Sequence, residues 1–362
     1  MPTRAETLTE AARLRALFQA AGALPIETPI LQPSEILLDL YGEDIRARAY
    51  VTSDALHGEQ MLRPDFTVPV VQMHMEFGAE PARYTYSGEV FRHQDEHPDR
   101  ASEYVQVGYE LFDRTNAAAA DAEVFARIAE AVAGLNLRAA TGDIGILMAA
   151  VWGLDTTERR KAALMRHIWR PRRFRALLDR YSRRAPVPPT RAALLAADDP
   201  LAISAPWIGK RGQTEIADRI DALRADAETP PISATEISAL DNLLSVRETA
   251  PFALAHLRDI AVDLPSITAS LYLLEARLGA LDACGIDVEN LDFEASYGRT
   301  SMEYYDGFVF GFYAERRPDL PPIATGGRYD ALTRHLGGGS EIPAVGGVLR
   351  PGLMLELGEG AT

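Results

Sequence analysis

Residues 104–112 read Tyr-Val-Gln-Val-Gly-Tyr-Glu-Leu-Phe, an alternation that predicts a β-strand with two different faces. The apolar face, which suits packing against helices, carries Val105, Val107, Tyr109 and Leu111. The other face carries Gln106, Gly108 and Glu110. A glycine between an amide and a carboxylate predicts clear space above the sheet and a floor for a small polar ligand. The alternative is a bulge at the glycine and a solvent-facing glutamate on a half-open sheet.

Two further segments, residues 83–92 and 303–313, repeat this pattern of glycines beside polar groups on one strand face. The faces concerned carry Gly88, Val90 and Arg92 in the first segment, and Tyr305, Gly307 and Gly311 in the second. The opposite face of the second segment carries Phe308, Phe310 and Phe312. Three coincident cases favour a binding site, in which Glu110 and Gln106 accept N–H donors and Arg92 binds a carboxylate or phosphate.

The rest of the chain predicts an α+β protein with a helical insertion. Thr7 and Glu10 have the spacing of a capping box for a first helix, and Gly22 is a suitable stop. Prolines then allow only extended edge segments over residues 24–35, and an alanine-rich helix is expected over residues 117–135. Residues 159–282 read as successive helices, whereas strands return at 291–314. We therefore expect a discontinuous core of residues 1–157 and 285–362 around an insertion of residues 158–284.

Composition excludes several classes of protein. The 362 residues predict about two domains, and the net charge of −15 opposes a general affinity for nucleic acid or anionic membrane. One cysteine, Cys284, permits no intrachain disulfide and no cysteine metal cluster. The longest nearly unbroken apolar run, residues 144–154, is too short to span a membrane, and no secretory signal opens the chain. We expect a cytoplasmic protein without a metal or cofactor.

Residues 159–184 hold eleven basic side chains and one acidic one, a net charge of +10. The simplest interpretation is a solvated helical face, with an apolar side packed inward that comprises Ile168, Trp169, Phe174, Leu177 and Leu178. Docking onto an acidic partner surface is the second interpretation, and contact with tRNA is the third.

Five ordered motifs make the chain resemble the catalytic core of class II aminoacyl-tRNA synthetases of the histidyl type. They are residues 62–67 (LRPDFT), 91–94 (FRHQ), 106–110 (QVGYE), 302–307 (MEYYDG) and 326–330 (GGRYD). The resemblance implies an antiparallel sheet flanked by helices, with dimerisation through the motif 1 segment around Pro29. It also implies a histidine pocket formed by Asp65, Thr67, Arg92, Gln106, Glu110, Tyr304 and Tyr305.

Departures from the family pattern concern the phosphate-binding groups. The arginine that acts on the forming adenylate is replaced by Thr300, followed by Ser301, and the motif 3 arginine is replaced by Leu353. Arg350 and Pro351 stand where a small Gly-Leu pair belongs, and only 15 residues follow Gly347, where an anticodon-binding domain would continue. Adenylation needs cations over the phosphates, and each lost group typically lowers the rate about a hundred- to a thousandfold.

This pattern is similar to that of the regulatory subunits of ATP phosphoribosyltransferase. The resemblance implies a chain without catalytic residues that joins the short-form catalytic subunit, supports the first step of L-histidine biosynthesis and transmits feedback inhibition by histidine. Two alternatives stay open. The first is an active histidine-adenylating enzyme, against which Thr300 and Leu353 argue. The second is an RNA-binding or kinase-sensor paralogue, which would need a tRNA-facing surface.

Overall fold

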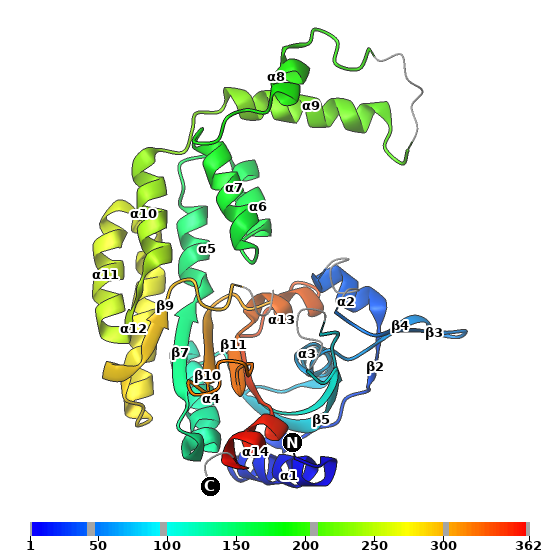
Figure 1. Cartoon of the computed structure of the whole chain (residues 1–362), viewed down its shortest axis with the longest axis vertical. Helices are drawn as coiled ribbons and strands as arrows, with labels where there is room; N and C mark the ends of the chain where they lie inside the picture. Colours follow the sequence, from blue (N-terminus) through cyan, green and yellow to red (C-terminus); the bar gives the residue numbers. More distant parts are fainter. Residues whose placement is uncertain (1, 42–47, 95–99, 203–208, 300–303, 360–362) are drawn as a thin grey trace.

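A computed structural model describes residues 2–41, 48–94, 100–202, 209–299 and 304–359. Within these residues the core is a nine-stranded sheet (Figure 1). Its strands, in spatial order, are β1 (Leu24–Pro25), β5 (Ala82–Phe91), β6 (Glu103–Phe112), β12 (Ala344–Leu349), β11 (Ala324–Arg328), β10 (Phe308–Tyr313), β7 (Arg138–Asp143), β9 (Asp292–Glu294) and β8 (Arg247–Thr249).

The sheet is mixed rather than purely antiparallel. Six of the pairings are antiparallel, but β1 runs parallel to β5 and β7 runs parallel to β9. The expected antiparallel sheet is therefore correct for its centre and wrong near its edges. In each of these two parallel pairs, a long crossover connection and not a hairpin joins the two strands.

Helices cover both faces of the sheet. The apolar face predicted for β6 lies against α1 (Arg4–Ala20) and α4 (Ala117–Val132), so that prediction is confirmed. The ring centroids of Phe18 and Tyr109 are 5.3 Å apart, and Phe125 of α4 contacts all three predicted phenylalanines of β10. On the other face, His74 of α3 (Thr67–Phe77) stacks on Phe112 at 3.9 Å.

The first helix begins one turn earlier than predicted. Thr3 is its N-cap and forms a capping box with Glu6, whereas Thr7 donates from its hydroxyl to the Thr3 carbonyl. Both Thr3 to Glu6 and Thr7 to Glu10 fit the capping pattern, and the earlier pair gives the longer helix. The stop is as predicted, because Gly22 follows the helix with φ +91°.

The proline-rich segment is extended as far as Pro33, as predicted, and forms edge structure, whereas its last two residues, Ser34 and Glu35, already belong to α2. It contributes β1 and one strand of a small second sheet, whose strand order is β2 (Leu31–Pro33), β4 (Gly58–Leu62) and β3 (Val51–Asp54). The remaining helices near the sheet are α2 (Ser34–Tyr41), α5 (Ile144–Trp152), α13 (Asp330–Leu336) and α14 (Pro351–Glu359). Short 3-10 turns are η2 (Ala133–Leu135), η3 (Pro265–Ile267) and η4 (Val288–Asn290). No described helix has the length and apolar character needed to cross a membrane.

The middle of the chain is helical, as predicted, with one exception. Its helices are α6 (Glu158–Arg166), α7 (Pro171–Tyr181), α8 (Pro189–Ala196), α9 (Gln213–Glu228), α10 (Ala234–Ser245), α11 (Ala250–Asp263) and α12 (Thr268–Ala283). Figure 1 shows α6 to α9 projecting from the sheet and α10 to α12 standing beside it. The exception is β8, which pairs with β9 and gives the core sheet its last strand.

Intramolecular ion pairs account for much of the basic segment. Asp226 of α9 binds three arginines, Arg160 at 2.7 Å, Arg180 at 2.7 Å and Arg191 at 3.3 Å. Asp241 of α10 pairs with Arg175 and Arg184. On the inner side Ile168, Phe174 and Leu178 are buried, as predicted, while Trp169 and Leu177 are partly buried against the core. Four of its eleven basic residues, Arg160, Arg175, Arg180 and Arg184, thus join α6 and α7 and the residues after them to α9 and α10.

Candidate functional site

Glu110 lies at the centre of the sheet, where β6 pairs with β5 and β12. Its side chain is 1% exposed. Both carboxylate oxygens accept a phenolic hydrogen bond, Oε1 from Tyr86 at 2.8 Å and Oε2 from Tyr329 at 2.5 Å. On the neighbouring strand, a Cβ at Gly346 would stand 1.4 Å from Oε2, so this glycine makes room for the carboxylate. The site is therefore built around a buried carboxyl whose position the protein fixes from both sides.

The environment of Glu110 holds its carboxyl close to half-ionised at neutral pH. Burial raises its pKa to about 7, and the nearby Asp65 acts in the same direction. Hydrogen bonds from Tyr329, Tyr86 and Thr67 oppose that rise. A carboxylate has about four lone-pair positions, so one remains for a ligand after the two tyrosines and Thr67 have bound. Such a shifted group is typical of a functional site.

The glycines on this face do not leave an open floor, so that expectation is wrong. A Cβ at Gly108 would stand 2.1 Å from the Tyr86 ring, and one at Gly327 would stand 2.7 Å from the Tyr305 ring. The missing side chains make room for tyrosine rings of the protein itself. A ligand would therefore contact a layer of tyrosines and Glu110 above the sheet, and not the strands directly.

Gln106 lies on the same face, opposite Gly88 of β5. Its side chain is 2% exposed, and its Oε1 atom accepts no hydrogen bond from the residues that the structure describes. A buried acceptor without a donor costs about 1–3 kcal/mol. The amide oxygen therefore indicates a place where a ligand N–H group or a water molecule binds.

The other predicted pocket residues come from three separate segments. Asp65 and Thr67 are buried at the start of α3, and Tyr304 donates to the Thr67 hydroxyl at 3.3 Å. Tyr305 is buried, and its pKa is raised by burial and by Glu110. Arg92 follows β5 and donates from Nε to the Pro64 carbonyl at 2.6 Å.

The structure thus gathers the predicted residues on one face of the sheet. The charges of Glu110, Asp65 and Arg92 all influence the pKa of Tyr305, so these side chains lie within electrostatic range of its hydroxyl group. Tyr305 itself precedes β10, because the strand predicted over residues 303–313 begins only at Phe308.

Two tyrosines of the site, Tyr86 and Tyr329, were not among the predicted residues. Tyr86 lies two positions from Gly88 on the same strand face, and Tyr329 belongs to the GGRYD motif. Both signals were present in the sequence. Neither indicates a hydrogen bond to Glu110, because that contact depends on how distant strands are paired.

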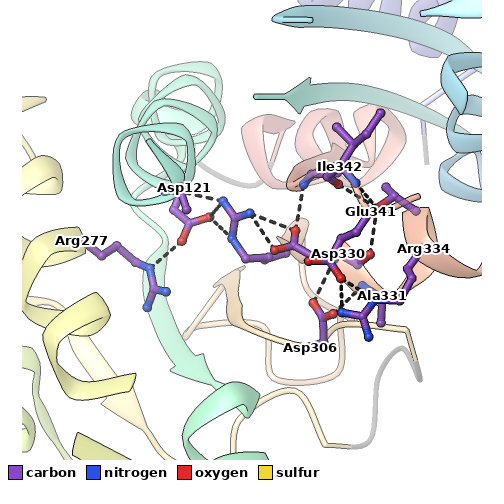
Figure 2. A network of polar contacts seen from close by, with 12 residues as sticks. Asp121, Arg277, Asp306, Asp330, Ala331, Arg334, Glu341 and Ile342 are labelled. Carbon is purple, nitrogen blue, oxygen red and sulfur yellow. Dashed lines mark hydrogen bonds and ion pairs between the residues drawn. The ribbon is translucent and has the colours of Figure 1, made fainter. Parts of the chain in front are cut away.

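A network of ion pairs and hydrogen bonds connects Arg277, Asp121, Asp330 and Asp306 (Figure 2). Asp121 of α4 accepts from Arg277 of α12 at 2.7 Å and from Arg328 of β11 at 2.7 Å. Arg328 also pairs with Asp330 at 2.9 Å, and the backbone N–H of Asp330 donates to Asp306 at 3.0 Å. The network therefore runs from the helical segment, through the sheet, to the turn that follows Tyr305.

Asp306 carries a second shifted carboxyl. Burial and the neighbouring Asp330 raise its pKa to about 7, against the backbone N–H groups of Ala331 and Asp330. These amides donate at 2.5 and 3.0 Å. Asp306 is thus bound to the start of α13 and fixes the turn between Tyr305 and β10.

Comparison with known proteins gives a consistent result. The family model described as histidyl-tRNA synthetase matches residues 1–199 and 214–351. Proteins named ATP phosphoribosyltransferase regulatory subunit from Brucella anthropi and Brucella ovis are 31% identical over 354 and 363 residues, covering 92% of this chain and 93% of each relative. The chain belongs to the histidyl-tRNA synthetase-like family of ATP phosphoribosyltransferase regulatory subunits.

Solved structures of low identity show the same fold. A Bacillus halodurans C protein, titled an ATP phosphoribosyltransferase regulatory subunit/histidyl-tRNA synthetase, aligns with TM-score 0.68 and 23% identity, over 99% of this chain and 80% of that chain. The histidyl-tRNA synthetase of Nostoc sp. PCC 7120 aligns with TM-score 0.65 and 17% identity, over 98% of this chain and 72% of that chain. The class II synthetase-like fold is thereby established.

One of the positions expected to depart from the synthetase pattern, Leu353, lies within the described residues. Leu353 lies in α14 and packs as a partly buried side chain against the apolar core, so no cation stands there. Thr300 and Ser301 lie outside the described residues. In the described residues beyond β12, α14 is the last element.

Proposed function

We propose that this chain is the non-catalytic regulatory subunit of ATP phosphoribosyltransferase and works with the short-form catalytic subunit. It would support the first step of L-histidine biosynthesis and carry the response to histidine. The observation that carries this proposal is the 31% identity, over 92% of the chain, to proteins with that name. A regulatory role also fits Leu353, an apolar side chain where a synthetase has an arginine.

The proposed ligand of the tyrosine-rich site is L-histidine. Glu110 and Gln106 would accept its N–H groups, Asp65 and Thr67 would hold its ammonium group, and Arg92 its carboxylate. Tyr304 and Tyr305 would pack against it. The support is the buried Gln106 oxygen, which has no donor among the residues that the structure describes, on the same strand face as a carboxyl that ionises near neutral pH. A ligand can change the activity of a complex only through different affinities for its active and inhibited states.

The complex can be tested by reconstitution. Co-expression with a short-form catalytic subunit should give a stable hetero-oligomer, and phosphoribosyl-ATP formation should rise when this chain is added. Absence of both effects would exclude the proposed partner.

Histidine binding is a separate test. Calorimetry on the isolated chain should detect histidine, and Gln106→Leu should weaken binding at least tenfold, because it removes the acceptor at nearly constant volume. Gln72→Leu on α3 is a control, since Gln72 lies in a half-buried helical position. Equal affinity in both variants and the wild type would refute the pocket.

The alternative function is histidine adenylation. Histidine-dependent exchange of pyrophosphate into ATP, at rates typical of a synthetase, would overturn the regulatory proposal. We expect no exchange above background.

Self-association, domain division and location belong to the same proposal. Exposed Ile30, Leu31 and Val51 lie in and beside the small sheet near Pro29, and their apolar surface supports dimerisation there. We retain residues 1–157 and 285–362 as the core and 158–284 as the insertion, which has α6 to α9 as its projecting part and contributes β8 to the core sheet. The composition and the single cysteine support a cytoplasmic location.

A further inference from the structure

The helices α11 and α12 pack against each other and carry an exposed apolar face. Its large side chains are all more than half exposed, namely Phe252 at 69%, Val262 at 80%, Tyr272 at 67% and Leu273 at 55%. Exposed Ala255 and Ala276 belong to the same face, at helical spacing. Figure 1 shows both helices at the outer edge of the molecule. Single apolar side chains are normal on a surface, whereas a face shared by two helices indicates a contact.

The size of the apolar face suits the centre of a protein–protein interface. Its two exposed aromatic rings alone present on the order of 250 Å². With Val262 and Leu273, the face reaches the range of about 300–600 Å² that the largest apolar patch of a soluble protein has. A stable interface buries about 800 Å² on each partner and has an apolar centre inside a polar rim. The charge of the rim then determines which partner fits.

Unpaired carboxylates form that rim. Asp259 and Asp263 of α11 and Asp282 of α12 are exposed, and none of them binds a cation within the part of the chain that the structure describes. Glu275, by contrast, pairs with Arg258 at 2.6 Å across the two helices. The same face of a second copy would place acid against acid, which is unfavourable. The face therefore favours a partner surface that carries unpaired cations.

This chain has such a surface on its projecting helices. Within residues 159–184, the arginines Arg159, Arg166, Arg172 and Arg173 are exposed and pair with none of the described carboxylates. The first two lie two turns apart on one side of α6, and the other two lie in the first turn of α7, which packs on α6. We call these four residues the basic surface.

The basic surface matches the apolar face in more than charge. Guanidinium groups bind carboxylates through paired N–H donors, and they stack on aromatic rings such as those of Phe252 and Tyr272. The aliphatic stems of arginine also cover apolar surface. A pair of basic helices can therefore bury this face without having a large apolar patch of its own.

We propose that the basic surface of one copy of this chain docks on the apolar face of a second copy. Each copy has both surfaces, so a two-fold pair forms the contact twice and is closed. The contact is separate from the one proposed near Pro29, which uses the small sheet. It needs neither histidine nor a catalytic subunit, so it can be tested on the chain alone.

Sedimentation velocity of the full chain tests this contact. The wild type should associate at 50 mM salt and less so at 500 mM, because salt screens exposed charges. Asp259→Arg should weaken association at least tenfold, since it places like charges together. Phe252→Ser should weaken it at both salt concentrations, because an apolar contact is not screened. Glu76→Arg is the matched control: Glu76 is an exposed acid on α3, outside both surfaces, and its replacement should leave association unchanged.

An exchange of charges identifies the two surfaces as partners. One variant carries Asp259→Arg and Asp263→Arg, and a second carries Arg172→Asp and Arg173→Asp. Each should associate weakly alone, whereas their mixture should regain the affinity of the wild type, because both contacts of the mixed pair then join opposite charges. All four positions are exposed, so both variants should keep the melting temperature of the wild-type chain.

Three results would overturn the proposal. One is association that neither charge-exchanged variant weakens, and its loss in Val51→Ser would assign it to the small sheet. Another is a mixture that associates no better than its two components, because that would indicate a general effect of net charge. The third is a wild type that stays monomeric at high micromolar concentration while Asp259→Arg prevents binding of a catalytic subunit, which would assign the apolar face to that subunit.

Discussion

Replacing Glu110 by glutamine should change how the stability of this protein depends on pH. The folded carboxyl has a pKa of about 7, against an ordinary value of 4.5. The folded state therefore keeps a proton that the unfolded state releases as the pH rises from about 4.5 to about 7. Stability contributed by this group falls across that window and is constant above it.

The interval between the two pKa values corresponds to about 3 kcal/mol in the free energy of unfolding. Glutamine is nearly the same size and stays neutral at every pH. At pH 5 the variant should have about the stability of the wild type, or about 1 kcal/mol less, because one tyrosine hydrogen bond must rearrange. At pH 8 the free energy of unfolding of the variant, relative to that of the wild type, should be about 3 kcal/mol higher than at pH 5.

Urea denaturation at pH 5, 6, 7 and 8 measures this difference directly. Asp306 also titrates near 7, but it is present in both proteins and cancels. Glu123→Gln is a suitable control: Arg83 and Tyr109 hold the pKa of Glu123 below its ordinary value, so its contribution is complete at pH 5. That variant should show a constant loss of stability between pH 5 and 8. A constant difference for Glu110→Gln would refute the reasoning.

The affinity for histidine should rise with pH, whereas the stability contributed by Glu110 falls. If only the ionised carboxylate accepts the ligand N–H groups, the competent fraction rises from roughly a tenth at pH 6 to roughly nine tenths at pH 8. The affinity should then rise about tenfold over this range. The glutamine variant should lose this dependence.

Three further predictions concern other parts of the structure. Asp121→Asn should lower the free energy of unfolding by about 3 kcal/mol in urea titrations, because it leaves two buried arginines each with one carboxylate, and exposed Asp319→Asn should change it by less than about 0.5 kcal/mol. Gly346→Ala should abolish histidine binding in calorimetry, since its Cβ would stand 1.4 Å from a Glu110 oxygen, and normal affinity would contradict the site geometry. Asp226→Ala should unfold the projecting helices first, so limited proteolysis should cut α6 to α9 faster while the sheet resists, and unchanged cleavage would show that the arginine cluster is dispensable.

Local patterns predicted the parts of this fold that depend on neighbouring residues. Alternation along residues 104–112 gave the correct faces for β6, and the spacing of Phe308, Phe310 and Phe312 gave the face that packs on α4. These patterns work because the period of a strand is a property of consecutive residues.

Features that depend on distant pairing could not be predicted in the same way. Residues 247–249 (Arg-Glu-Thr) carry no apolar alternation, and they form β8 only because β9 lies alongside. The glycines indicated space, but only the strand register shows that Tyr86 and Glu110 fill it. Most predicted pocket residues were found together because the family resemblance, and not local pattern, supplied them.

The order of strands in the sheet also affects how the protein folds during synthesis. The centre of the sheet joins β6 to β12, and the hydrogen bond from Tyr329 to Glu110 spans 219 residues. A ribosome must therefore release nearly the whole chain before the site can assemble, and the early strands wait with an unpaired edge. Long-range closure of this kind slows folding. We expect refolding to be limited by the pairing of β6 with β12, and the nascent chain to depend on protection of β6 until its partner strand is made.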